Sequence, residues 1–213
     1  MAYNASAQLY YKEFLPRSPA ESLKALLRGS RATRARNNAD ALLQAGFAAP
    51  RNIAWGSLPS GREYLFSSAS PGQSVTHWLC DILTTRHGAD LQQRRTLLRA
   101  LGTFIGRLHA RGFTHGDLRP GNILACEQGE RFHFALIDNE SNSHKVPPPG
   151  RRLLKNLMQL NMLPPANLSR SDRMRFFCAW RAQMRELQPI ESKILAAQAH
   201  QWAMQRLADK GLL

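Results

Sequence analysis

The sequence has no uninterrupted apolar run of about 18 residues, the length that a membrane-spanning helix needs. Residues 1–6 lack the charged and then apolar pattern of a secretory signal peptide. Cysteine is scarce, and Cys80, Cys126 and Cys178 are far apart, which excludes a disulfide framework and a cysteine-rich zinc site. These absences predict a protein that stays in the cytoplasm.

Acidic residues are also few, because 15 Asp and Glu stand against 29 Lys and Arg and leave a net charge of +14. Such a surface attracts polyanions, namely nucleic acid, anionic lipid or a phosphorylated saccharide. Nucleic acid is disfavoured, because the sequence has no aromatic-rich RNA-binding signature, zinc finger or basic heptad. A bias of composition or solubility is the alternative explanation of the charge.

The densest basic segment near the N-terminus lies between residues 17 and 36 and includes Arg28, Arg31, Arg34 and Arg36. One interpretation is a solvated helix face, which is the ordinary fate of a charge run. The other is a surface that docks on an anionic membrane or a phosphorylated glycolipid. Both stay open at this point.

Hydrophobic residues make up 43% of the 213, which is enough for a packed core. Pattern and turn residues predict a strand at 8–15, a strand pair at 52–56 and 62–67, and short strands at 123–125 and 132–137. They predict helices at 18–29, 31–45, 75–83, 91–111, 151–162, 171–186 and 190–209. This order indicates an α+β fold with a small β-rich lobe at 1–70, a hinge at 67–74 and a helical lobe at 75–213.

The most informative motif is His-Gly-Asp-Leu-Arg-Pro-Gly-Asn at 115–122, followed by an apolar strand that ends at Asp138. This pattern is typical of a phosphoryl-transfer loop and its metal-binding aspartate. Asp117 would accept the proton of the hydroxyl that is phosphorylated, while Asn122 and Asp138 would hold Mg²⁺ against the phosphates of ATP. The alternative is a Gly- and Pro-rich turn whose Asp and Asn side chains only cap backbone groups.

With these motifs the chain resembles the protein-kinase-like superfamily, and more closely the bacterial lipopolysaccharide core kinases, the Kdo and heptose kinase family. The resemblance extends from Tyr-Lys-Glu-Phe at 11–14 and Ala-Gly-Phe-Ala-Ala-Pro at 45–50, through the 115–122 loop, to segments at 156–161 and 172–177. It implies a kinase fold with a truncated N-lobe. It also implies transfer of phosphate from ATP, with Mg²⁺, to a sugar of the lipopolysaccharide inner core at the cytoplasmic face of the inner membrane.

Under this resemblance, Lys12 matches the strand lysine that contacts the α- and β-phosphates, and Asp117 matches the catalytic aspartate. Asn122 and Asp138 match the metal ligands. Arg119 stands where protein kinases have a lysine near the transferred phosphate, which implies charge stabilisation. A snorkelling lysine on an edge strand is the alternative for Lys12.

The motif's remaining residues match in other ways. His115 is expected to brace the loop through hydrogen bonds. Gly116, where protein kinases have arginine, implies the small-molecule-kinase style without control by an activation-loop phosphate.

Three departures from the family pattern bear on activity. The few residues before Lys12 leave no room for a Gly-rich loop over the phosphates, and the helix after Lys12 has no glutamate where the lysine's partner usually stands. Asn139 and Glu140 replace the usual Phe-Gly, and Glu140 is expected to cap a turn rather than to bind metal. A non-catalytic module that binds glycolipid or a partner protein, and a kinase for another small molecule, therefore remain as alternatives.

Overall fold

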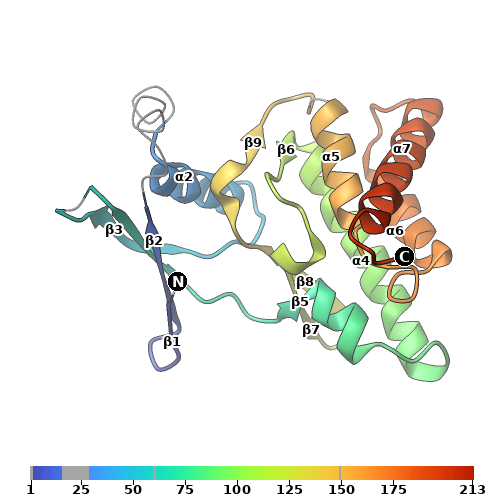
Figure 1. Ribbon diagram of the computed structural model, residues 1–213, viewed down its shortest axis with the longest axis horizontal. Coiled ribbons are helices and arrows are strands. Elements are labelled where there is room, and N and C mark those ends of the chain that lie inside the picture. The colour runs from blue at the N-terminus through green and yellow to red at the C-terminus, as the bar shows by residue number, and fades with distance from the viewer. Residues whose placement is uncertain (1, 16–28, 60, 149) are drawn as a thin grey trace. The chain divides into compact units, whose positions relative to one another are not determined.

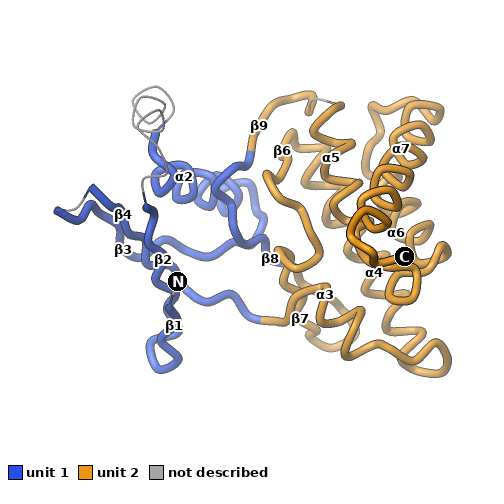
Figure 2. Tube along the Cα trace, in the orientation of Figure 1, with its two compact units in different colours: residues 1–71, 135–142 blue, residues 72–134, 143–213 orange. Residues whose placement is uncertain are grey.

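The computed structural model describes residues 2–15, 29–59, 61–148 and 150–213. The chain forms two compact units, which Figure 2 shows in different colours. Unit 1 comprises Met1–Pro71 and Ala135–Asn142, and unit 2 comprises Gly72–Phe134 and Ser143–Leu213. The lobes expected at 1–70 and 75–213 stay a prediction, and the units place the short segment 135–142 with the N-terminal residues.

Unit 1 is built on a four-stranded antiparallel sheet with the order β1-β2-β4-β3 (Figure 1). Its strands are β1 (Ala2–Asn4), β2 (Leu9–Phe14), β3 (Asn52–Ser57) and β4 (Glu63–Ser68). Alternate residues of β2 point to one face, and there Phe14 packs with Leu65 and with Ala32 and Ala35 of helix α2 (Arg31–Gln44). This small apolar cluster holds the helix on the sheet.

The segment 135–142 joins unit 1 through backbone pairing. Ala48 and Ala135 form an isolated parallel bridge, and the amide of Leu136 donates to the carbonyl of Ala48 at 2.9 Å. Asn38 of α2 donates to the carbonyl of Asn139 at 2.7 Å. These bonds attach the residues around Asp138 to α2 and to the segment that follows it, although Asn38 and Asn139 are about a hundred positions apart in the sequence.

Unit 2 is mostly helical (Figure 1). Its helices are α3 (Val75–His77), which continues as a π-helical turn at Trp78–Ile82, α4 (Gly88–Ala110), α5 (Gly150–Leu160), α6 (Arg170–Gln183) and α7 (Pro189–Ala208). Its strands are β5 (Gln73–Ser74), β6 (Phe113–Thr114), β7 (Ile123–Gln128), β8 (Arg131–Leu136) and β9 (Ser143–His144). They form a β5-β7-β8 sheet, whose last strand continues into unit 1, and a β6-β9 pair.

Helices α4 and α6 pack closely because α4 carries glycine at the contact. A Cβ on Gly102 would lie 2.3 Å from the carbonyl oxygen of Phe176, and one on Gly106 would lie 2.7 Å from that of Trp180. Neither position could hold a side chain without moving α6. Trp180, which is completely buried, fills the space beside this contact.

A buried ion-pair network ties the start of α6 to α4. Arg94 is fully buried, and it donates to Asp172 at 3.1 Å and to the carbonyls of Leu79 and Leu83 at 3.0 and 2.9 Å. Burial raises the pKa of Asp172, but the hydrogen bond from Ser169 and the charge of Arg94 outweigh it and leave that pKa below its usual value. Arg94 therefore supplies hydrogen-bond donors to one carbonyl within the π-helical turn and to one directly after it.

The structure confirms the helices expected at 31–45, 91–111, 151–162, 171–186 and 190–209 and the principal strands, with ends that shift by one to three residues. The prediction of a regular α-helix at 75–83 was wrong, because α3 passes into a π-helical turn after three residues. The short strands β1, β5, β6 and β9 were not predicted. The helix expected at 18–29 lies mostly outside the described residues.

Within the part of the chain that the structure describes, no helix combines the length and apolar character needed to cross a membrane.

The close contact between α4 and α6 generates a prediction about stability. We expect Gly102→Ala to lower the free energy of unfolding by about 1–3 kcal/mol, because overpacking outweighs the higher helix propensity of alanine. Urea denaturation measures the change. Gly150→Ala is the matched control, since a Cβ there meets nothing within 4 Å. Equal stability of the two variants would contradict the packing argument.

Candidate active site

The loop between β6 and β7 places Asp117 at the centre of a set of hydrogen bonds. The Nε of Arg119 lies 2.9 Å from both carboxylate oxygens of Asp117, and its Nη2 also donates to this carboxylate. The Nε2 of Gln159 donates to Oδ1 at 2.9 Å. The side chain of Asp117 is still about one-third exposed, so the carboxylate is fixed in direction and open to a substrate.

Asn122 and His115 close the loop from its two ends. The Nδ2 of Asn122 donates to the backbone oxygen of Asp117 at 2.8 Å and to its Oδ2 at 3.2 Å. The Nδ1 of His115 accepts from the amide of Asp117 at 3.1 Å, and this histidine is almost completely buried. The amide nitrogen of Asn122 is thus used inside the loop, which leaves its Oδ1 as the atom that could bind a cation.

Helix α5 supports the loop with three side chains from one face. Asn156 accepts from the amide of His115 at 3.0 Å and donates to its carbonyl at 2.7 Å. Lys155 donates to the carbonyl of Gly116 at 2.7 Å. Together with the bond from Gln159 to Asp117, these contacts determine the path of the loop backbone.

Gln159 acts on two residues at once. Its Oε1 accepts from the amide of Leu118 at 2.9 Å, while its Nε2 donates to Asp117. Leu118 is fully buried, so its amide would otherwise have no partner. Sequence reasoning assigned no role to Asn156 or Gln159. The available signal was polar residues three apart on the apolar side of a helix, among leucines that the structure buries.

His109 of α4 extends this network into the core. Its Nδ1 accepts from the indole of Trp180 at 2.9 Å, and its Nε2 lies 3.2 Å from Oδ1 of Asn156. The ring is therefore neutral, with its proton on Nε2. Burial lowers the pKa of His109 to about 4, although the hydrogen bond to Asn156 acts in the opposite direction.

Unit 1 holds the second group of predicted site residues. The Nζ of Lys12 in β2 forms an ion pair with Oδ1 of Asp138 at 2.7 Å. Asp138 directly follows the apolar strand segment and has φ 60° and ψ 50°, a left-handed conformation that costs a non-glycine residue about 1–2 kcal/mol. Its turn is held by Asn139, whose Nδ2 donates to the carbonyl of Leu136 at 2.8 Å. The strained residue is thus fixed by its neighbours.

Glu140 occupies a different role from the one expected. It faces α2, where the Nε of Arg31 lies 2.5 Å from its Oε1 and Nη2 lies 3.0 Å from its Oε2. The expectation that Glu140 caps its own turn was wrong, because a bidentate arginine from another element uses its carboxylate. The ion pair between Arg31 and Glu140 was not foreseen.

The six predicted residues therefore fall into two groups, one in each compact unit. His115, Asp117, Arg119 and Asn122 meet in unit 2, and Lys12 and Asp138 meet in unit 1. The turn that precedes Lys12, at residues 5–8, contains no glycine, and the Oδ1 of Asn4 accepts from the amide of Ala7 at 3.0 Å.

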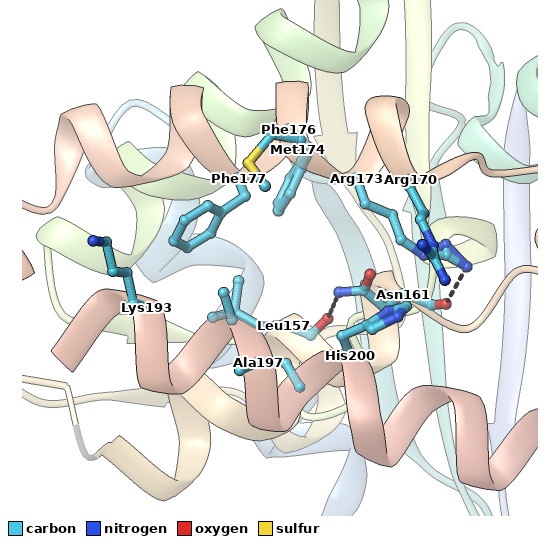
Figure 3. Close-up of a pocket in the computed structure, with 12 residues that line it drawn as sticks. Leu157, Asn161, Arg170, Arg173, Met174, Phe176, Phe177, Lys193, Ala197 and His200 are labelled. Carbon is cyan, nitrogen blue, oxygen red and sulfur yellow. Dashed lines mark hydrogen bonds between the residues drawn. The ribbon is translucent and has the colours of Figure 1, made fainter. Parts of the chain in front are cut away.

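A cavity of about 540 Å³ lies between α5, α6 and α7 in unit 2 (Figure 3). Leu157, Phe176 and Phe177 contribute to its mostly apolar wall, and Arg173 and His200 stand at one end. Leu157 lies on α5 between Asn156 and Gln159, two of the side chains that hold the 115–122 loop. Burial lowers the pKa of His200, and Arg173 and Arg170 add to the effect.

Comparison with known proteins agrees with this geometry. A family model described as the lipopolysaccharide kinase (Kdo/WaaP) family matches residues 3–180. The structure is similar to that of WaaP in complex with acyl carrier protein, with TM-score 0.65 and 20% identity over 82% of this chain and 76% of that one. It also resembles WbdD, with TM-score 0.51 and 23% identity over 92% of this chain and 42% of that one. A search of the curated proteins found no match.

The fold is therefore of the protein-kinase-like class. The chain belongs to the lipopolysaccharide kinase (Kdo/WaaP) family, whose model spans both the Lys12 strand and the 115–122 loop. The resemblance inferred from the sequence motifs is confirmed.

The neutral, buried His109 generates a prediction about pH. Because the unfolded chain binds a proton near pH 6.5 and the folded chain only near pH 4, the unfolding free energy should fall as pH drops through this window. The expected loss is about 3 kcal/mol at pH 4 relative to pH 7. Urea denaturation at several pH values measures it. In His109→Gln this component should disappear, and an unchanged pH dependence would refute the assignment.

The hydrogen bonds of Gln159 generate a prediction about phosphate transfer. We expect Gln159→Leu to lower kcat about 10- to 100-fold with little change in KM, because the Asp117 carboxylate loses its orientation. Initial rates of phosphate transfer measure both constants. Asn161→Ala, directly after α5, is the control, since its side-chain amide donates to the carbonyl of Leu157 and does not contact the loop. A rise in KM alone would contradict the positioning role.

Proposed function

We propose that this protein transfers the γ-phosphate of ATP, with Mg²⁺, to a sugar hydroxyl of the lipopolysaccharide inner core. The observation that carries the proposal is the carboxylate of Asp117, which Arg119, Asn122 and Gln159 hold in one orientation while it stays open to solvent. A base that must accept a proton from a hydroxyl needs this combination of fixed geometry and access. Family membership supports the reaction class.

Each site residue has a role in the proposal. Asp117 orients the acceptor hydroxyl and takes its proton. Arg119, which is 60% exposed, offsets negative charge on the transferred group. Lys12 contacts the phosphates of the nucleotide. His115 braces the loop, because its ring is buried and bonded to the amide of Asp117.

Asn122 and Asp138 are the residues that would hold Mg²⁺. Each residue by itself offers an oxygen that a hard cation prefers, a carboxylate oxygen on Asp138 and the amide oxygen on Asn122, whose hydrogen bonds engage its nitrogen rather than that oxygen. When bound, Mg²⁺ neutralises charge on the phosphate oxygens. The protein's own part is to keep these two side chains directed while ATP binds.

The substrate class rests on charge together with the family. A net charge of +14 favours a phosphorylated glycolipid and a position at the anionic inner face of the inner membrane. Of the four arginines proposed for this contact, Arg28 lies outside the described residues, and Arg31 is engaged by Glu140. Arg36 lies 4.5 Å from the centre of the Trp55 ring, and the exposed face of that indole adds an aromatic group suited to a membrane surface. Arg34 and Arg36 are thus the two arginines that we propose to contact the anionic membrane surface.

A partner protein is a further candidate. WaaP was solved in complex with acyl carrier protein, and this likeness is the reason to test such a carrier here. Binding of the two purified proteins, measured in a pull-down, is the direct assay.

A non-catalytic binding module is the second candidate function. The observation in its favour is the glycine-free turn at residues 5–8, which offers no flexible loop to cover phosphates. Binding of Mg-ATP separates the two. Saturable binding at a hundredfold excess over Kd would stabilise the fold by about 2.7 kcal/mol, while a module that does not use nucleotide would show no thermal shift.

The base role of Asp117 is tested by substitution. We expect Asp117→Asn to lower kcat by about 10²- to 10⁴-fold while Mg-ATP binding stays near the wild-type level. Transfer of labelled phosphate from ATP to core lipopolysaccharide measures the rate. Asp209→Asn, an exposed residue after α7, serves as the control. If wild type and Asp117→Asn transfer label equally, the catalytic proposal is wrong.

A further inference from the structure

Helix α2 does not supply the glutamate that usually accompanies such a lysine. In protein kinases the strand lysine pairs with a glutamate of the following helix. The one acidic residue of α2 is Asp40, and it accepts a hydrogen bond from Asn52 at 2.8 Å. In the described part of unit 1, the carboxylates that Lys12 contacts are Asp138 at 2.7 Å and Glu140 at 3.9 Å. Both belong to the turn after β8.

Asp138 cannot serve Lys12 and a divalent cation equally well. The ammonium group lies within hydrogen-bond distance of Oδ1, and a second cation on the same carboxylate would be repelled by it. Lys12 must therefore weaken its bond to Asp138 when that carboxylate takes up another charge. The nucleotide phosphates then become one partner of the lysine, and a protein carboxylate within reach would hold its ammonium group in place beside them.

Glu140 meets this requirement. Its Oε2 is the next carboxylate oxygen to the Lys12 ammonium, and the side chain is held from the other side by the fork of Arg31. The side chains of Glu140 and Arg31 are 16% and 14% exposed, against 45% for Asp138, so the pair is shielded from solvent. Phe14 lies beneath both cations, 5.2 Å from Lys12 and 5.7 Å from Arg31.

Two further contacts fix Glu140 in position. Arg31 is the first residue of α2, next to the cap Ser30, whose hydroxyl accepts from the amide of Thr33 at 3.0 Å. Asn38, two turns along the same helix, donates to the carbonyl of Asn139, the residue before Glu140. The helix therefore grips the turn at two points. The Oε2 of Glu140 already lies 3.9 Å from the ammonium group of Lys12.

We propose that Glu140, held by Arg31, takes the place of the glutamate that α2 lacks and receives Lys12 when Asp138 binds the metal. The inference rests on the proposed function and goes beyond it in naming a positioning residue and its support. In protein kinases the helix carries the carboxylate that pairs with the strand lysine, and here the two elements exchange roles. The turn supplies the carboxylate, and the helix supplies an arginine that orients it.

The first test measures nucleotide affinity. We expect Glu140→Gln to raise the Kd for Mg²⁺ with a non-hydrolysable ATP analogue about tenfold, the size of one lost contact between charged groups. Arg31→Lys should raise it by a smaller factor, because it keeps the charge and loses the fork. Glu13→Gln is the matched control. Glu13 precedes Phe14 on the same strand and pairs with Arg62 at 2.9 Å instead.

The second test observes Lys12 directly and does not depend on activity. Lysines carrying ¹³C-methyl groups give separate NMR signals, and Lys12→Arg identifies the one from Lys12. In wild type and Glu13→Gln, the signal should move to a new, single position when Mg²⁺ and the analogue are added. In Glu140→Gln it should move to a different position and broaden, because no protein carboxylate then fixes the lysine beside the phosphates. The signal of Lys210 serves as the internal reference.

The outcomes separate the two claims. Wild-type affinity in Glu140→Gln, or a Lys12 signal that responds as in wild type, overturns the role of Glu140 and leaves the proposed function intact. Loss of Mg²⁺ binding in Glu140→Gln with an unchanged Lys12 signal would make Glu140 a metal ligand and would also overturn the role proposed for it. A wild-type protein that binds no nucleotide would remove the proposed function and this inference together. Thermal denaturation of each variant, compared with wild type, shows that the unit stays folded.

Discussion

The loop at residues 115–122 keeps a fixed backbone path while the carboxylate of Asp117 points outward, and helix α5 supplies the contacts that fix it. The backbone of residues 115–118 runs against the interior of unit 2, where unpaired amides and carbonyls are costly. Asn156, Lys155 and Gln159 supply the missing partners from one face of α5. Without them these backbone groups would lose their partners, and the carboxylate of Asp117 would be held by Arg119 and Asn122 alone.

The same helix connects the loop to the core on one side and to the apolar cavity on the other. Asn156 continues through His109 to the indole of Trp180, beside the contact of α4 with α6. Leu157, the next residue, faces the cavity. Asn156, His109 and Trp180 are all buried, so a change in any of these hydrogen bonds would disturb its neighbours. The packing of the helical unit and the geometry of the loop therefore depend on one another.

In unit 1, ion pairs rather than buried hydrogen bonds position the predicted site residues. The left-handed conformation of Asp138 directs its carboxylate toward Lys12, and contacts from α2 hold the turn against the strain. Arg31 and Glu140 neutralise one another in a shielded position, where an unpaired charge of either sign would be costly. The absence of a glutamate from α2 is therefore compatible with an ordered Lys12.

By itself the sequence determined much of the local structure and the chemical class. Apolar residues at helical spacing located α4 to α7, since this periodicity reports directly which face is buried. The string at 115–122 with Asp138 indicated phosphoryl transfer, because that chemistry needs these residue types in this order. Only the tertiary structure decided that Glu140 faces Arg31 and that Gln159 holds Asp117. These partners are 109 and 42 positions apart, and spacing along the chain carries no information about such contacts. The π-helical turn after α3 also involves a tertiary contact, because Arg94 of α4 donates to the carbonyls of Leu79 and Leu83.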